Sequence, residues 1–284
     1  MTAAKTQKRF LDTSVLRPML HGSAAYKRHL EEQMGSDPCY ISQYVMMEFR
    51  RSFIMSLVAF YFYLELPTIK TVGDALQLWS HKFKAGELKA VMQLIAQLLD
   101  AGRIGTENPR DLEKAQLAIG RYIKRVDAKA RRKFKDSSKD TTGCGRAAVP
   151  LKIDLHRLRE DLQIFNDAFA NTKACRSQCR IEDLPFTKYR QEVDDYIKLA
   201  GSLPSRKETQ GFVRIADKLA DVLAKGDQSC SCTVCGAIGD AVIALDAPRE
   251  MCLEHVDQSF DHLCPPINQT HRKHSSEVRV LKGT

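Results

Sequence analysis

The segment KRFLDTS, residues 8–14, is the part of the sequence that decides the fold. Its apolar centre, Phe10-Leu11, has the pattern of a short buried strand, and Asp12 follows it directly. A second segment of this kind, PCYIS, occupies residues 38–42. Short buried strands that alternate with helical sequence are typical of a parallel sheet. The start of the chain therefore predicts an α/β fold.

The sequence between the strand-like ends is mostly helical. Residues 43–66 form a long apolar stretch that predicts one helix ending before Pro67. Further on, apolar side chains recur every three to four positions, and strand-like sequence returns at 251–256 and 277–281. We therefore expect a core with a parallel central sheet at residues 1–69 plus 229–284. A mainly α-helical insertion at residues 70–228 would interrupt this core.

Composition indicates a globular chain. Of its 284 residues, 43% are hydrophobic and 28% are charged. The longest apolar run, residues 53–64, is too short to span a bilayer, and no secretory signal is visible at the N-terminus. Nine cysteines without an export signal favour a reducing compartment. We expect a cytoplasmic protein that does not interact with membranes.

Positive charge is concentrated in one segment. The chain carries 44 basic and 35 acidic residues, and residues 121–135 alone hold eight basic side chains and one acid. This segment predicts the end of a helix, where cations suit the helix dipole without any ligand. Alternatively, the surface binds the phosphates of a nucleic acid. The side chains of that second interpretation are Lys124, Arg125, Lys129, Arg131, Arg132, Lys133 and Lys135.

Four carboxylates stand where the predicted core would converge. Asp12 and Asp257 each follow a predicted strand, Glu48 lies in the apolar helix, and Asp240 begins a further helix. Sites in open α/β sheets form at the carboxyl ends of strands. Clustered carboxylates need a compensating cation, and Mg²⁺ or Mn²⁺ prefers such oxygen ligands. Each acid also has a role that needs no metal. These roles are a helix cap for Asp12, a solvated helix face for Glu48, a helix-dipole contact for Asp240 and a turn for Asp257.

Each acid lies in a segment with its own pattern: FLDTSVL at 10–16, SQYVMMEF at 42–49, DAVIAL at 240–245 and EHVDQSF at 254–260. In this order the four segments resemble the motifs of the PIN-domain ribonucleases, and the first is the most specific. The resemblance covers roughly residues 8–66 and 236–284, which is less than half of the chain.

The resemblance implies both a fold and an activity. The fold is a three-layer α/β/α arrangement in which Asp12, Glu48, Asp240 and Asp257 hold Mg²⁺ or Mn²⁺ and are catalytic, with Ser14 near the metal. The activity is that of an endoribonuclease, which hydrolyses the phosphodiester bonds of single-stranded RNA. Because many members are toxins of toxin–antitoxin pairs, the resemblance also implies an inhibitory, antitoxin-like protein partner.

The chain departs from this family in two places. Glu48 and Asp240 are 192 positions apart, much farther than in the family, and the helical insertion supplies the difference. Val256 stands where the family usually has a hydroxyl or a cation beside the fourth acid. The size of the insertion argues against the role of a small toxin.

Two cysteine pairs predict a structural metal site. Cys232 and Cys235 have the C-x-x-C spacing of zinc ligands, while Cys175 and Cys179 form a looser pair. Zn²⁺ held by these four thiolates would fasten the insertion to the core. Free thiols or a redox disulfide are the alternatives. A second candidate set is Cys252, His255, His262 and Cys264.

Two other functions fit the same features. A core of this kind that has lost activity would bind nucleic acid or act as a scaffold. A structure-selective DNA nuclease would also use clustered carboxylates and divalent ions. The sequence favours the metal-dependent ribonuclease because its acids occur in the order of the family motifs.

Overall fold

A computed structural model of the chain describes residues 7–82, 85–136, 145–170, 188–204, 206–225 and 232–276. Two units can be distinguished. The boundaries predicted at residues 69 and 229 do not coincide with this division. Unit 1 comprises Met1–Met47, Arg131–Ala148 and Asn171–Thr284, and unit 2 comprises Glu48–Ala130 and Val149–Ala170.

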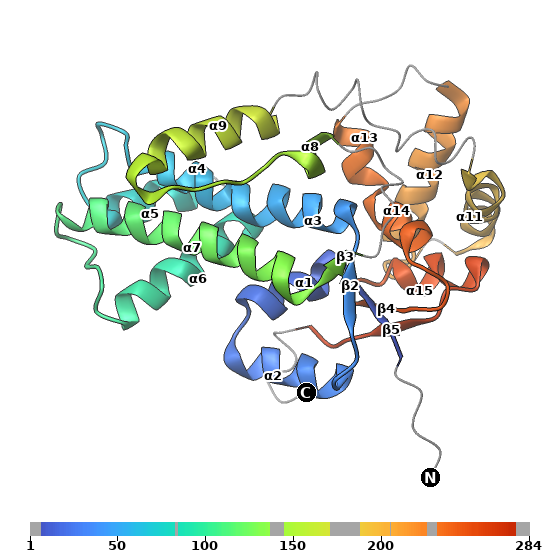
Figure 1. Cartoon of the computed structure of the whole chain (residues 1–284). Coiled ribbons are helices and arrows are strands. Elements are labelled where there is room, and N and C mark those ends of the chain that lie inside the picture. Colours follow the sequence, from blue (N-terminus) through green and yellow to red (C-terminus); the bar gives the residue numbers. More distant parts are fainter. Residues whose placement is uncertain are drawn as a thin grey trace, which may run out of the picture. The chain divides into compact units, whose positions relative to one another are not determined.

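The strands of unit 1 form one parallel sheet, so the predicted α/β class with a parallel sheet is confirmed (Figure 1). Within the described residues the sheet has five strands in the order β3-β2-β1-β4-β5. Phe10 in the central strand lies opposite Tyr40 on one side and Leu253 on the other. The strands are β1 (Arg9–Leu11), β2 (Cys39–Ile41), β3 (Lys135–Asp136), β4 (Cys252–His255) and β5 (His271–Lys273).

Two of these strands differ from the sequence prediction. The helix predicted to run to Lys135 ends at Lys133, and Lys135 instead begins β3. Strand β5 has the sequence HRK, which carries no apolar alternation, so no strand was predicted there. The strand predicted at 277–281 lies outside the described residues.

Polar caps fix the helices that follow β1. The Asp12 side chain accepts the N–H of Ser14 at 2.9 Å and so starts α1. Ser23 caps α2 by accepting the N–H of Tyr26 at 3.2 Å, and Gly35, with φ of 63°, ends it. The described helices that lie wholly in unit 1 are α1 (Thr13–His21), α2 (Ala24–Met34), α8 (Gly145–Ala148), α11 (Arg190–Ser202), α12 (Gln210–Lys225), α13 (Cys232–Ala237), α14 (Gly239–Asp246), α15 (Phe260–Leu263) and the short turn η5 (Pro265–Ile267).

The described part of unit 2 contains helices joined by turns and irregular connections, and it has an aromatic core. The fully buried Trp79 meets the rings of Phe60 and Tyr63 edge-on, with centroids 5.1 and 5.3 Å away. No helix in the described ranges is long and apolar enough to cross a membrane. The elements are the π-helical turn η1 (Arg50–Ile54), α4 (Met55–Tyr63), α5 (Val72–Lys82), α6 (Ala85–Asp100), η2 (Leu155–Arg157) and α9 (Leu158–Ala170), while α3 (Gln43–Phe49) and α7 (Asp111–Lys133) contribute residues to both units.

A buried ion pair ties the segments of unit 2 together. Arg50 in η1 donates from Nε to Asp127 of α7 at 2.9 Å, and both side chains are almost fully buried. Its Nη1 donates to the carbonyl of Val149 at 2.8 Å. Removing one partner of such a pair leaves an uncompensated buried charge, which typically costs about 3–5 kcal/mol.

Candidate active site

Asp12 lies at the carboxyl end of the central strand β1. Its backbone N–H donates to the carbonyl of Glu254 at 3.0 Å, which continues the pairing of β1 with β4. Its Oδ2 accepts both the N–H and the hydroxyl of Ser14. Asp12 therefore is a helix cap, one of the alternatives that the sequence left open. The cap stands at the sheet end where ligand sites of parallel sheets form.

Ser14 connects Asp12 to the end of β4. Its hydroxyl donates to the Asp12 carboxylate and accepts the N–H of Val256 at 3.0 Å. Asp257 is the next residue along the chain, so this contact orders the turn that carries it. Ser14 is thus a positioning residue between two of the predicted acids.

A second serine joins Asp240 to Asp257. Asp240 lies in the first turn of α14, and the buried Ser259 hydroxyl is 2.5 Å from its Oδ2. The same hydroxyl is 3.2 Å from Oδ1 of Asp257, which also accepts the Ser259 N–H at 3.1 Å. Sequence reasoning missed Ser259, although it lies inside the fourth acid-bearing segment. The hydroxyl holds the two carboxylates close together.

The electrostatics of this cluster favour a cation. Burial, together with the negative charges of Asp12 and Asp257, raises the pKa of Asp240 from 3.8 to about 7, although the Ser259 hydrogen bond opposes the rise. Asp12 and Asp257 are therefore close enough to Asp240 to disfavour its ionised form. A divalent cation among them would remove this repulsion.

Glu48, the fourth predicted acid, belongs to unit 2. It is partly buried on α3, and its Oε1 accepts a hydrogen bond from Arg51 at 3.4 Å. Its membership of the carboxylate cluster stays a prediction.

A cavity of about 580 Å³ opens beside the acids of unit 1. Asp240, Asp257 and Ser259 line it, and helix α12 contributes Arg214 and Lys218 to the same lining. Carboxylates and cations in one cavity can accommodate a phosphate together with a metal ion. The cavity therefore suits an anionic phosphodiester better than an apolar ligand.

Sequence analysis did not identify these two cations. Arg214 and Lys218 are four positions apart on α12, whose apolar residues are buried on its other face. Lys218 also pairs with Asp221 at 2.7 Å. Their spacing is that of an ordinary solvated helix face, so it gave no signal of a site.

The predicted nucleic-acid-binding residues fall into both units. Lys133 pairs with Glu31 at 2.9 Å, and Lys135 lies on β3 with its Nζ 5.9 Å from the centre of the Tyr40 ring. In unit 2, the guanidinium of Arg125 lies 5.2 Å from the ring centre of Tyr122. Unit 1 contains Arg131, Arg132, Lys133 and Lys135, and unit 2 contains Lys124, Arg125 and Lys129.

The predicted zinc set cannot be placed as a whole. Cys175, Cys179 and the side chain of Cys232 lie outside the described residues. Cys235 is buried, and the Tyr44 hydroxyl donates to its carbonyl at 2.7 Å. Zinc at this set therefore stays a prediction.

A different metal-competent cluster lies next to the acids. The ligand atoms of His255, Asp261 and His271 lie within 4.8 Å of one another. His255 is buried, with Nε2 3.0 Å from Nδ1 of His271 and Nδ1 2.8 Å from the carbonyl of Asp257. These three side chains could hold a metal ion.

This cluster shares only His255 with the set Cys252, His255, His262 and Cys264 expected from the sequence. His262 instead packs against the ring of Phe212, with centroids 5.5 Å apart. Burial raises the pKa of the thiols of Cys252 and Cys264 to about 11 and about 12, which keeps both protonated. In the metal-free protein the cysteines of that set are therefore buried, protonated thiols.

The site thus consists of three acids of unit 1 held by two serine hydroxyls, beside a cavity that also contains two cations. The residues come from opposite ends of the sequence, and the parallel sheet brings them together. The chain matches no known protein family, no curated protein and no solved structure.

Proposed function

We propose that this protein is a metal-dependent nuclease that hydrolyses phosphodiester bonds of single-stranded RNA. The observation that carries the proposal is the convergence of Asp12, Asp240 and Asp257 in unit 1. Mutually repelling carboxylates are costly unless a cation binds among them. Their presence at the end of a parallel sheet supports a catalytic use.

The donor set fits Mg²⁺ or Mn²⁺, because both prefer carboxylate oxygens. Such an ion, when bound, supplies Lewis acidity toward the phosphate and lowers the pKa of a bound water. Ser14 and Ser259 hold the carboxylates in place. Arg214 and Lys218 in the same cavity would balance the negative charge of the phosphodiester.

A PIN-like architecture is part of the proposal. The parallel sheet supports it in general terms, and the order of the four acid-bearing segments supports it specifically. In this interpretation Glu48 completes the metal site. The basic side chains of residues 124–135 hold the RNA backbone.

The Asp12→Asn variant tests the proposal. Cleavage of a single-stranded RNA in Mn²⁺ should fall about hundredfold or more, because a negatively charged metal ligand is lost. RNA binding and the circular dichroism spectrum should remain. Asp217→Asn is the matched control, since Asp217 lines the same cavity but does not contribute to the raised pKa of Asp240. Normal cleavage by Asp12→Asn, with contaminating nuclease excluded, contradicts the proposal.

The same assay separates the alternatives. Preferential cleavage of branched DNA would assign a DNA nuclease. Failure to bind Mg²⁺ or Mn²⁺ in a calorimetric titration would favour an inactive nucleic-acid-binding or scaffolding protein. Expression with and without the protein encoded by the neighbouring gene tests for an inhibitory partner.

A further inference from the structure

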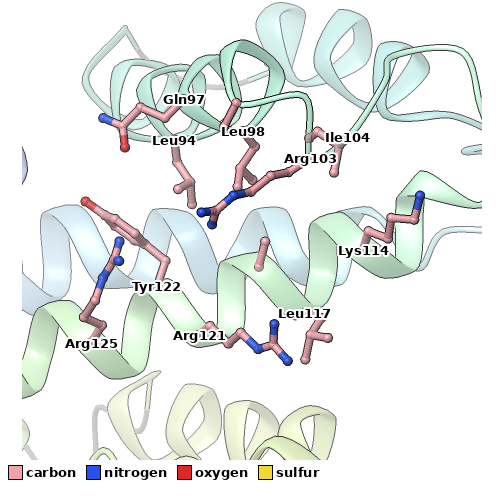
Figure 2. A pocket seen from close by; sticks show the side chains of 12 residues that line it. Leu94, Gln97, Leu98, Arg103, Ile104, Lys114, Leu117, Arg121, Tyr122 and Arg125 are labelled. Carbon is pink, nitrogen blue, oxygen red and sulfur yellow. The ribbon is translucent and has the colours of Figure 1, made fainter.

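A second cavity lies within unit 2, between helices α6 and α7 (Figure 2). Its volume is about 530 Å³, which is in the range of small-molecule sites. Its lining residues recur every three to four positions on one face of each helix. The apolar and aromatic part of this lining includes Leu94, Leu98, Ile104, Leu117, Ala118 and Tyr122.

Four cations lie around this apolar lining, and none of the lining residues is acidic. Lys114 is neutralised by Asp111, whose Oδ1 lies 2.7 Å from its Nζ. The other three are the exposed side chains of Arg103, Arg121 and Arg125. Within the described residues these arginines form no ion pair. They leave an uncompensated positive field over an apolar cavity, which would attract an anion.

The end of α6 brings Arg103 to the cavity. Gly102 has φ of 62°, a conformation that glycine adopts without strain. The Gly102 N–H donates to the carbonyl of Leu99 at 2.8 Å, and the N–H of Arg103 donates to the carbonyl of Leu98 at 2.9 Å. Figure 2 shows the guanidinium of Arg103 extending from this turn into the space between the two helices.

We propose that this cavity binds a nucleoside phosphate. The guanidinium of Arg125 lies over the ring of Tyr122, 5.2 Å from its centre, and planar groups of this kind stack with bases. Arg103 and Arg121 offer paired N–H donors to phosphate oxygens. A bare inorganic anion would leave the apolar lining unused. The base therefore lies against the apolar lining, and the phosphate contacts the arginines.

The ligand is either a free nucleotide or one nucleotide of an RNA strand, and only the second source rests on the proposed nuclease function. Both have the same chemistry, a planar base attached to phosphate. The test uses the full chain carrying Asp12→Asn in EDTA, so that no cleavage occurs. Titrations measure the affinity for ATP, for inorganic phosphate and for an end-labelled single-stranded RNA.

We expect Arg121→Ala to weaken binding about tenfold, because it removes charge-assisted hydrogen bonds to phosphate. Arg110→Ala is the matched control, an exposed arginine of the same unit that does not line the cavity and is not among the predicted RNA-binding side chains. It should change affinity less than about twofold. Ala118→Leu fills the cavity without changing charge and should also weaken binding about tenfold.

Competition between the ligands identifies the source. If ATP displaces the RNA, the cavity binds one nucleotide of a strand. The same assignment follows if RNA binds, ATP does not, and RNA binding is lost in Arg121→Ala and Ala118→Leu. ATP binding without competition assigns a free nucleotide. The proposal is overturned if neither affinity depends on Arg121 and Ala118, or if inorganic phosphate binds as tightly as ATP. Because binding is measured without metal, this outcome is independent of whether the protein cleaves RNA.

Discussion

At the scale of single residues, Asp240 and His255 couple the folding of unit 1 to pH with opposite signs. The pKa of Asp240 is raised from 3.8 to about 7 by burial and by the charges of Asp12 and Asp257. The pKa of His255 is lowered from 6.5 to about 4, chiefly by burial, although its hydrogen bond to the Asp257 carbonyl opposes this. In the metal-free protein both groups change the stability of the fold over the same range, between about pH 4 and about pH 7.

For Asp240, the folded state binds the proton more tightly than the unfolded state. Its contribution to stability is therefore complete below about pH 4 and is lost as the pH rises toward about 7. Asp240→Asn should remove this loss. The free energy of unfolding of the variant, minus that of the parent, should therefore increase as the pH rises between these values. Urea unfolding in EDTA measures it. A constant difference between the two proteins over this range would contradict the raised pKa.

For His255, the sign is reversed. Its contribution to stability is complete above about pH 6.5 and is lost as the pH falls toward about 4, because the unfolded state binds the proton more tightly. His255→Gln should lower this acid sensitivity. Imidazole NMR signals of the parent protein provide a direct check. If the His255 ring titrates near its ordinary pKa, the prediction is wrong.

The sequence located some functional residues and missed others for a physical reason. Asp12 was found because it ends a strand, and Asp240 because it begins a helix in a recognisable segment. Ser259 and Arg214 have no such local signature. Their position beside the acids depends on how α12, α14 and α15 pack, which periodicity does not determine.

At the scale of secondary-structure elements, the contact between α7 and α9 can be tested at Gly120. A Cβ atom there would lie 2.4 Å from Cδ1 of Leu158. We expect Gly120→Ala to lower the free energy of unfolding by about 1–3 kcal/mol, although alanine favours helices. The control is Gly201→Ala in α11, where a Cβ would meet no atom within 4 Å. Its effect should be neutral or slightly stabilising. Urea denaturation of both variants measures the difference, and an unchanged Gly120→Ala protein would exclude the contact.

The helices were easier to predict than the edge strands. The apolar side chains that recur every three to four positions predicted helices in the middle of the chain, and α6 is one of them. Strand β3 contains only Lys135 and Asp136, and β5 is entirely polar or charged. These strands exist through backbone pairing with β2 and β4, and their side chains carry no pattern that reports it.

At the scale of the whole molecule, the division into units was the hardest feature to predict. The sequence grouped residues 43–66 with the core because they form one apolar helical stretch. In the structure Phe53 contacts Tyr122, and Trp79 contacts Phe60, so this stretch is part of the core of unit 2 from Glu48 onward. Periodicity shows that a helix face is buried, but it does not identify the surface that covers it.

The net charge of +9 leads to a prediction about RNA binding. Binding to phosphates releases counterions, so RNA affinity should fall steeply between about 50 and 200 mM salt. The slope of the logarithm of affinity against that of salt concentration gives the number of phosphate contacts. Asp12→Asn should leave this slope unchanged, because the substitution removes none of the basic side chains that bind phosphates in the proposed binding mode. An affinity that does not depend on salt would exclude the proposed electrostatic binding.

The two edges of the sheet have a consequence for self-association. An edge strand exposes unpaired N–H and C=O groups, and a long apolar edge allows strands of other molecules to add to the sheet. Among the described strands, the two at the edges are Lys135–Asp136, both exposed, and the cationic HRK strand at residues 271–273. Such short, charged borders offer an incoming chain few hydrogen bonds and an unfavourable electrostatic environment. They protect the sheet from growing into an intermolecular stack.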